Sequence, residues 1–234
     1  AEDGIRDRQA RLVGSEMCIR DRAGTIRASF PDAEIVAVCL GKAAAENTLR
    51  SAMAMGADRG ILIETDLPHD SLFTARALAA AIESDGRPQI IFTGKESIDS
   101  EGMQTHFRLA ERLGLPVATN VVKVDMDGDG VQVECEREPG VIDVIRMAMP
   151  CVVGAGKGLN TPNYPTFPDI MKSRKKPVRR IALSELAIDA PAAAVKIEEL
   201  VPAVEQRTPR ALTGSAADIA AQIVDILKNE AKVI

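Results

Sequence analysis

Apolar and polar residues alternate along the chain in a pattern that predicts an α/β fold. Short apolar runs at Glu34–Leu40, Gly60–Ile63 and Gln89–Phe92 have the length and composition of buried strands. Between them, Ala43–Met55 and Asp70–Ile82 place apolar residues at helical spacing. Strands that alternate with helices form parallel units with right-handed crossovers. We therefore expect a doubly wound, mostly parallel, Rossmann-like sheet.

The two predicted helices should each bury one face against that sheet. The residues expected to point inward are Leu49, Ala52 and Met53 in the first helix and Leu72, Ala75, Leu78, Ala79 and Ile82 in the second. Gly56 is expected to stop the first helix, because glycine readily adopts the backbone conformation found at helix ends.

A β-hairpin is predicted farther along the chain. Val121–Met126 and Val131–Cys135 alternate with period two about the turn sequence DGDG. The same residues satisfy the spacing of a calcium-binding loop, but such a loop is flanked by helices, and here the flanks are predicted strands. We therefore expect a hairpin, followed by a strand at Val141–Met149 and a buried run at Pro150–Gly154.

The proline-rich segment Leu159–Pro177 departs from this pattern. Its four prolines exclude a continuous helix or a central strand over most of its length. We expect a stiff, extended loop that carries Tyr164 and Phe167 and then turns into a short helix with Asp169 near its start. Such a loop suits docking, because little entropy remains to be lost on binding. A covering loop whose Phe167 caps the core is the alternative, and the residues alone leave both open.

The C-terminal part is typical of an arm that ends in a helix. Ala187–Ala194 is rich in alanine and proline, as linkers are. Ser215–Lys228 is predicted to be a helix with an apolar stripe made of Ile219, Ile223, Ile226 and Leu227. We expect residues 23–182 to form the α/β domain with its added hairpins, and residues 183–234 to form an arm that packs on a partner subunit.

The first 22 residues do not share the periodicity of the rest. They repeat IRDR at Ile5–Arg8 and Ile19–Arg22 and alternate charges without an apolar face. They resemble the translated adapter sequence that contaminates the ends of assembled reading frames, and a disordered charged tail is the alternative. We expect residues 1–22 to be foreign to the fold.

Charge and composition exclude several classes of function. The formal net charge is −5, and the basic cluster from Lys172 to Arg180 lacks interleaved aromatic residues, so we expect a solvated helix end and no nucleic-acid binding. Four cysteines without CxxC spacing and only two histidines argue against a metal site and for reduced thiols in the cytoplasm. No apolar run approaches the ~20 residues of a membrane-spanning helix, so no membrane insertion is expected.

A glycine-led loop follows the third predicted strand and enters a helix. In parallel sheets this is where nucleotides bind, since the loop lies at the carboxyl end of a strand and at a helix N-terminus. Lys95 offers a charge for a phosphate, and Ser97, Gln104 and Thr105 offer hydrogen bonds. The loop matches neither of the common glycine-rich phosphate motifs, and a structural loop capped by Asp99 is an equal alternative.

Four motifs, in the same order along the chain, resemble the β subunits of electron-transfer flavoproteins. Leu49–Glu64 is similar to that family's LRTALAMGADRAILVE, Gly94–Thr105 to its nucleotide loop GKQAIDDDCNQT, and Leu159–Pro177 to RLNEPRYATLPNIMKAKKK. Gln206-Arg207-Thr208 resembles the C-terminal QRTAG. The similarity runs from about Ala23 to Ile234. The family's first strand has no counterpart here.

The resemblance implies a heterodimer with an α subunit that holds the redox-active FAD. It implies that the β subunit binds AMP, or a second FAD in bifurcating relatives, and docks an acyl-CoA or related dehydrogenase. By matching motifs, the nucleotide site comprises Leu40, Gly94, Lys95, Glu96, Ser97, Ile98, Asp99, Ser100, Glu101, Gly102, Met103, Gln104 and Thr105. The partner-recognition residues are Tyr164, Phe167, Ile170 and Met171, and Arg137 and Glu138 lie near the α-subunit flavin.

Some residues depart from the family's pattern. Phe167 stands where the family has leucine, and Gly158, Thr161 and Asn163 replace charged residues of the docking loop. Ser100–Met103 replaces an acidic run and an asparagine, which leaves AMP and a second FAD both open.

The sequence therefore predicts an electron-carrier subunit of the bacterial cytoplasm rather than an enzyme in its own right. It would carry electrons from a dehydrogenase to a quinone reductase or another acceptor. A stand-alone AMP- or ATP-binding module is the alternative, but it would need neither the proline-rich loop nor the striped C-terminal helix.

Overall fold

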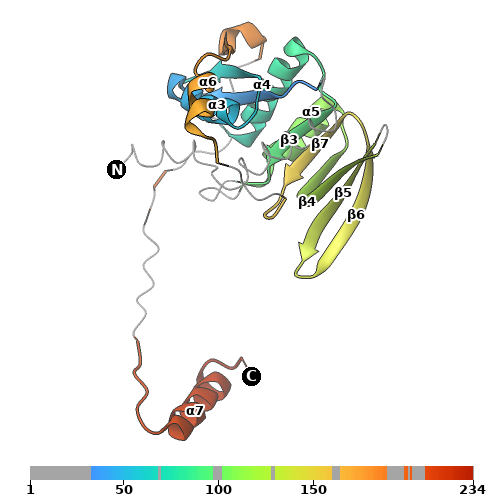
Figure 1. Cartoon of the computed structure of the whole chain (residues 1–234). Helices are drawn as coiled ribbons and strands as arrows, with labels where there is room; N and C mark the ends of the chain where they lie inside the picture. Colours follow the sequence, from blue (N-terminus) through green and yellow to red (C-terminus); the bar gives the residue numbers. More distant parts are fainter. Residues whose placement is uncertain are drawn as a thin grey trace. The chain divides into compact units, whose positions relative to one another are not determined.

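The computed structural model describes residues 33–67, 70–96, 102–127, 130–159, 164–188, 198–199, 201 and 209–233 (Figure 1). The chain divides into two compact units, Ala1–Val195 and Lys196–Ile234. Residues 1–22, most of the predicted linker and Gln206-Arg207-Thr208 lie outside the described residues. The first unit contains helices and parallel strands, which confirms the predicted α/β class.

The first sheet has three parallel strands in the order β1-β2-β8. They are β1 (Val36–Gly41), β2 (Arg59–Glu64) and β8 (Val178–Ala182). The first two match the predicted strands. The sequence did not predict β8, and the interpretation of its arginines as a solvated helix end is wrong. On this edge strand the consecutive residues Arg179 and Arg180 are both exposed, Val178 is half-buried and Ile181 is buried.

The second sheet has five strands in the order β3-β7-β4-β5-β6. They are β3 (Ile90–Gly94), β7 (Cys151–Ala155), β4 (Val117–Asp127), β5 (Gly130–Glu138) and β6 (Val141–Ala148). The first three run parallel, and β5 and β6 are antiparallel additions. Asp127 pairs with Gly130 across the turn between β4 and β5, which confirms the predicted hairpin.

The parallel strands therefore belong to two sheets and not to the single sheet that we predicted. Strand β1 is an edge of the first sheet and β3 an edge of the second, and no strand among the described residues pairs with both. Helix α4 (Ser71–Asp85) contacts both sheets. Its Ala77 and Ala81 pack on the first sheet, and its Ala75 and Ala79 pack against the second sheet and α5.

This double contact explains the errors in the predicted inward face of α4. A helix that touches two sheets buries more than one stripe, so Phe73, Ala77 and Ala81 are buried although they were not predicted to be. Leu72, predicted to point inward, is 39 % exposed. The predicted burial of Ala75, Ala79 and Ile82 is confirmed.

Helix α3 (Glu46–Ala54), which follows the 3-10 turn η1 (Ala43–Ala45), packs against the first sheet. Its buried residues are Leu49, Ala52 and Met53, as predicted. The short helix α6 (Phe167–Ser173) packs against α3. After β8 the first unit continues into the 3-10 turn η2 (Leu183–Leu186).

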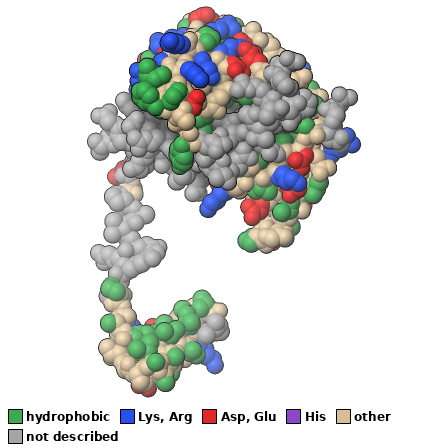
Figure 2. Space-filling model, in the orientation of Figure 1, with side chains coloured by type: hydrophobic (Ala, Val, Ile, Leu, Met, Phe, Trp, Pro, Cys, Tyr) green, Lys and Arg blue, Asp and Glu red, His purple; other side chains and the backbone are tan. Residues whose placement is uncertain are grey.

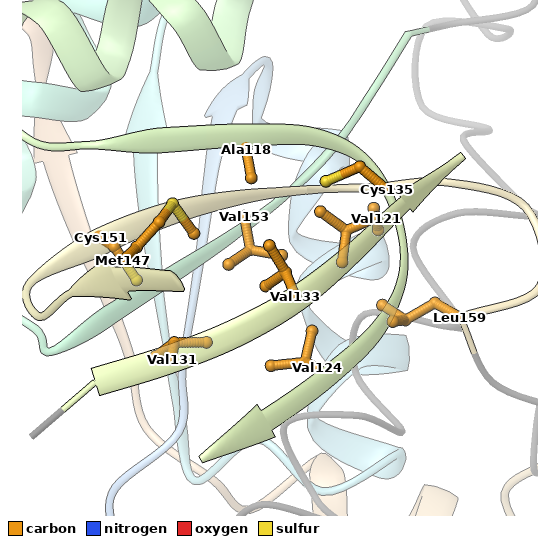
Figure 3. Close-up of a cluster of buried hydrophobic side chains, with 11 residues drawn as sticks. Ala118, Val121, Val124, Val131, Val133, Cys135, Met147, Cys151, Val153 and Leu159 are labelled. Atoms are coloured by element: carbon orange, nitrogen blue, oxygen red, sulfur yellow. The ribbon is translucent and has the colours of Figure 1, made fainter. Parts of the chain in front are cut away.

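Alternating apolar residues of β4, β5, β6 and β7 form the core of the second sheet (Figure 3). Val121, Val131, Val133 and Val153 are all fully buried. The opposite side, with Ile91 and Val152, packs against α4 and against α5 (Thr105–Leu113).

The second unit contains α7 (Ala216–Asp225) and the π-helical turn η3 (Ile226–Glu230). Ser215 caps α7 with Asp218 in a reciprocal capping box, which confirms the predicted start. Of the predicted apolar stripe, Ile223 is 44 % exposed, and Ile219, Ile226 and Leu227 are half-buried (Figure 2). Within the described part of the chain, no helix is long and apolar enough to cross a membrane.

Candidate functional site

The predicted nucleotide loop lies where the sequence places it, between the carboxyl end of β3 and the start of α5. Gly94 is the last residue of β3, and Lys95 forms an ion pair with Glu96 at 3.1 Å. Residues 97–101 lie outside the described residues, so Ser97, Ile98, Asp99, Ser100 and Glu101 stay predictions. Gly102, Met103 and Gln104 lead into Thr105, the first residue of α5.

The N-terminal end of α5 favours a negative charge. Gln104, the N-cap residue, makes no side-chain capping bond, and the first turn holds no acidic residue. The first N–H groups of a helix lack partners within the helix, and the helix dipole adds positive potential there. Lys95, the residue after β3, adds an ammonium group that is shared with the Glu96 carboxylate. This combination can bind the phosphate of a nucleotide.

A buried histidine below this helix end was missed by the sequence analysis. The side chain of His106 is fully buried, and its Nε2 lies 2.9 Å from the hydroxyl oxygen of Thr119 on β4. Burial lowers the pKa of His106, and the nearby charge of Lys95 lowers it further, and both favour the neutral imidazole. The only sequence signal was its position, directly after the predicted loop and on the apolar side of the helix.

Two polar atoms near this point lack hydrogen-bond partners among the described residues. They are Nδ1 of His106 and the hydroxyl oxygen of Thr93, one residue before the end of β3. Most buried polar groups in proteins are paired, so each such atom requires an explanation.

Leu40 is the predicted nucleotide-site residue that the structure does not bring to the loop. It lies on β1 and packs partly buried with Ile61, Ile63 and Ile181 of the first sheet. The loop leaves the second sheet, and the described contacts do not join the two. Its assignment to the nucleotide site stays a prediction.

The predicted recognition residues form an exposed apolar surface on α6 and just before it. Tyr164 is 78 % exposed, Phe167 74 %, Met171 43 % and Ile170 40 %. Phe167 therefore does not cap the core. It is also not part of an extended loop, as we predicted, because it is the first residue of α6. Thr166 is the N-cap, and its backbone N–H and hydroxyl both contact the Asp169 carboxylate.

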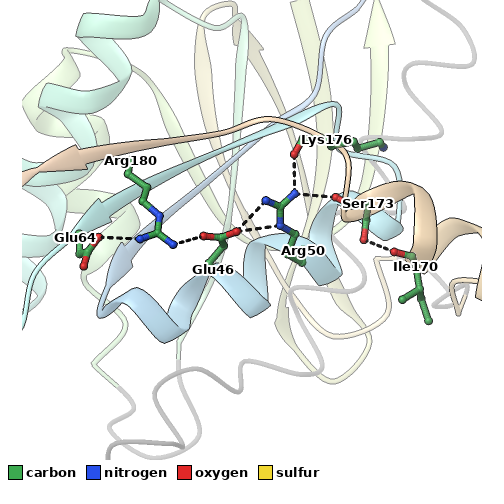
Figure 4. Close-up of polar contacts among 7 residues, drawn as sticks. All are labelled: Glu46, Arg50, Glu64, Ile170, Ser173, Lys176 and Arg180. Carbon is green, nitrogen blue, oxygen red and sulfur yellow. Dashed lines mark hydrogen bonds and ion pairs between the residues drawn. The ribbon is translucent and has the colours of Figure 1, made fainter.

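Charged side chains that donate to backbone carbonyls join helix α6 to helix α3. Arg50 of α3 donates through Nη1 to the carbonyl oxygens of Ser173 (2.9 Å) and Lys176 (2.6 Å), as Figure 4 shows. Lys176 in turn donates through Nζ to the carbonyls of Met53 (2.9 Å) and Ala57 (2.7 Å). These four bonds fasten the end of α6 to the end of α3.

Glu46 extends this network to the edge strand β8. Its carboxylate accepts from Arg50 at 2.8 Å and from Arg180 at 2.6 Å, and Arg180 also lies 3.7 Å from Glu64 (Figure 4). Hydrogen bonds from Arg180 and Arg50 lower the pKa of Glu46. Arg180 is therefore part of an ion-pair network and is not a free member of a basic patch.

Arg137 and Glu138, predicted to lie near a flavin, are the last two residues of β5. Both are exposed, and Nε of Arg137 donates to the carboxylate of Asp143 at 2.6 Å. The described contacts do not join them to the nucleotide loop or to α6, and their role stays a prediction.

Fold and site together define a protein with a candidate nucleotide-binding loop between β3 and α5 and a separate, exposed apolar surface on α6. Comparison with known proteins gives the family. The electron transfer flavoprotein domain matches residues 21–186. The chain is 35 % identical over 205 residues to the electron transfer flavoprotein subunit beta of Bacillus subtilis, with 86 % of this chain and 79 % of the relative covered.

Relatives in eukaryotes agree with this match. Identity is 33 % to the mitochondrial subunit beta of Arabidopsis thaliana, with 86 % of this chain and 78 % of the relative covered. Identity to the human electron transfer flavoprotein subunit beta is 34 %, with 82 % of this chain and 76 % of the relative covered. The chain belongs to the electron transfer flavoprotein β-subunit family, whose members are electron carriers.

Proposed function

We propose that the chain works as one half of a heterodimer with an electron transfer flavoprotein α subunit. In this proposal the α subunit holds most of the FAD, and this chain supplies a nucleotide site and the surface on which a dehydrogenase docks. Bound FAD supplies the electron-transfer chemistry. An acyl-CoA or related dehydrogenase delivers the electrons, and a quinone reductase or another acceptor receives them.

The observation that carries the proposal is the exposed apolar surface of α6. Large apolar side chains that lie together in solvent mark interaction sites, and aromatic anchors commonly carry much of the binding energy. The four bonds from Arg50 and Lys176 fix α6, so docking on it orders little further chain. The exposed apolar residues Ile223 and Val224 of α7 support a second interface, with the α subunit.

The nucleotide site is proposed at the loop Gly94–Thr105, with AMP as the ligand or a second FAD in its place. Both ligands contain a phosphate, which suits Lys95 and the uncapped start of α5. The buried free thiols of Cys135 and Cys151 fit the reducing cytoplasm in which we propose that the protein works.

Coexpression with an α subunit tests the proposal. We expect a yellow complex with one copy of each chain, whose flavin is reduced by an acyl-CoA dehydrogenase with its substrate and reoxidised by a quinone reductase. Denaturation should release AMP, or FAD in excess of one per complex. A chain that stays monomeric beside the α subunit and still binds AMP would instead support the stand-alone nucleotide module.

A further inference from the structure

The polar atoms left without partners form a small group at the carboxyl ends of the second sheet. Thr93 on β3 pairs in register with Gly154 on β7, and His106 lies over Gly154. Neighbouring strands are about 4.8 Å apart, so the Thr93 hydroxyl and the His106 ring belong to one region. Lys95 follows two residues after Thr93 and is close enough to lower the pKa of His106.

Gly154 is what allows the imidazole to lie against the sheet. A Cβ atom at position 154 would be 3.0 Å from Cδ2 of His106 and 3.3 Å from its Nε2. Contacts that short are tighter than nearly all contacts of real Cβ atoms, so a side chain at position 154 would require the His106 ring to shift. A histidine at 106 and a glycine at 154 thus make one fitted pair.

The orientation of the ring follows from the same contacts. The Nε2–Cδ2 edge faces Gly154, and Nε2 is bonded to Thr119. In an imidazole, Nδ1 is the corner opposite that edge, so Nδ1 points away from β7.

An unpaired polar atom in such an enclosed place costs roughly 1–3 kcal/mol unless a ligand or water supplies the missing bond. A neutral imidazole bonded through Nε2 can donate or accept at Nδ1, depending on its tautomer, and a threonine hydroxyl can do both. A phosphate accepts hydrogen bonds from both groups. The positive surroundings favour such an anion over a neutral group.

We propose that Thr93 and His106 are contacts for the phosphate group of the bound nucleotide, through the Thr93 hydroxyl and the His106 Nδ1. This inference rests on the nucleotide site proposed above and adds to it one residue of β3 and one residue of α5. The family resemblance carried over only residues up to Thr105, so these two contacts are additional.

Thr93→Val is the sharpest test, because valine keeps the shape of threonine and removes only the hydroxyl. The matched control is Thr74→Val in α4. Thr74 is also half-buried, its hydroxyl donates to the Asp70 carbonyl, and it does not belong to the loop Gly94–Thr105. Calorimetric titration of the full chain with AMP, inorganic phosphate and adenosine measures each affinity. Thr93→Val should weaken AMP about tenfold and leave adenosine unchanged, and Thr74→Val should bind AMP as the unmodified chain does.

A second readout observes the histidine directly. The chain has only two histidines, so His69→Gln assigns the His106 imidazole in nitrogen-15 spectra. AMP and phosphate should shift Nδ1 of His106, and adenosine should not. His106→Gln, whose amide can still bond to Thr119, should weaken AMP as Thr93→Val does.

The outcomes separate this inference from the proposed function. Normal AMP binding by Thr93→Val together with an unshifted His106 would overturn the inference and leave the nucleotide site standing. An equal loss of AMP and adenosine affinity would also overturn it, because the contact would not be to phosphate. If the unmodified chain binds neither AMP nor phosphate, the nucleotide site itself is wrong, and the inference falls with it.

Discussion

Phe167→Ala should weaken docking of the dehydrogenase without destabilising the chain. Phe167 is 74 % exposed, so a partner pocket would cover roughly 150 Å² of it, and at about 25 cal/mol per Å² this is about 3–4 kcal/mol before the costs of association. We expect a net loss of about 2 kcal/mol, or roughly a thirtyfold rise in Kd. The covered part of the side chain is only roughly 50 Å², which limits the loss of folding stability to about 1 kcal/mol.

The assay compares docking and stability on the same protein. The Kd for an acyl-CoA dehydrogenase and the rate of flavin reduction are measured on the heterodimer, and the thermal midpoint is measured beside them. Val144→Ala is the matched control, because Val144 is 62 % exposed on β6, outside the recognition surface. Phe167→Leu should keep most of the affinity, because leucine remains a large apolar anchor.

Two results would refute this reasoning. A Kd that rises equally in Phe167→Ala and Val144→Ala would mean that the contact is not specific to α6. An unchanged Kd with a large fall in the thermal midpoint would mean that Phe167 supports the fold, despite its exposure.

Two further predictions concern the frame around the docking helix. Lys176→Met should lower the free energy of unfolding, measured by urea titration, by about 1.5–3 kcal/mol, because the carbonyls of Met53 and Ala57 lose a charged donor. The control Lys175→Met, at an exposed position, should change the free energy of unfolding little. Equal losses in the two variants would contradict this prediction. Hydrogen bonds from Arg59 lower the pKa values of Glu34 and Asp85, so their stabilisation is complete above about pH 4.5 and is lost as the pH falls through the folded-state values. Between about pH 5 and about pH 3, the thermal midpoint of Arg59→Met should therefore fall less steeply than that of the unmodified chain. Parallel curves of thermal midpoint against pH for the two proteins would exclude this ion-pair cluster as a cause of acid sensitivity.

The local pattern of the sequence was enough to find most elements of the fold. Apolar runs located β1, β2, β3 and β7, and the alternation around the DGDG turn located the β4–β5 hairpin. The sequence missed β8, because Arg179 and Arg180 are consecutive and both exposed, which breaks the alternation expected of a strand and resembles a charged surface run. The division into two sheets was also missed, since periodicity shows that a strand is buried but not which strand lies beside it.

The candidate site was predicted unevenly for a similar reason. The loop could be found because glycine, lysine and a following helix stand together in the sequence. The pair of His106 and Gly154 could not, because the two residues are 48 positions apart and only packing brings them together. Phe167 was correctly predicted to be exposed by the docking interpretation, but its place at the start of a helix depends on the capping pair of Thr166 and Asp169.

The way α6 is fastened separates two kinds of evolutionary change. Arg50 and Lys176 reach backbone carbonyls, which every residue carries, so the support of α6 does not depend on the side chains that it displays to solvent. Substitutions at Phe167, Ile170 or Met171 can therefore alter which dehydrogenase is recognised while the helix keeps its position. A lineage could in this way exchange its electron donors without rebuilding the domain that carries them.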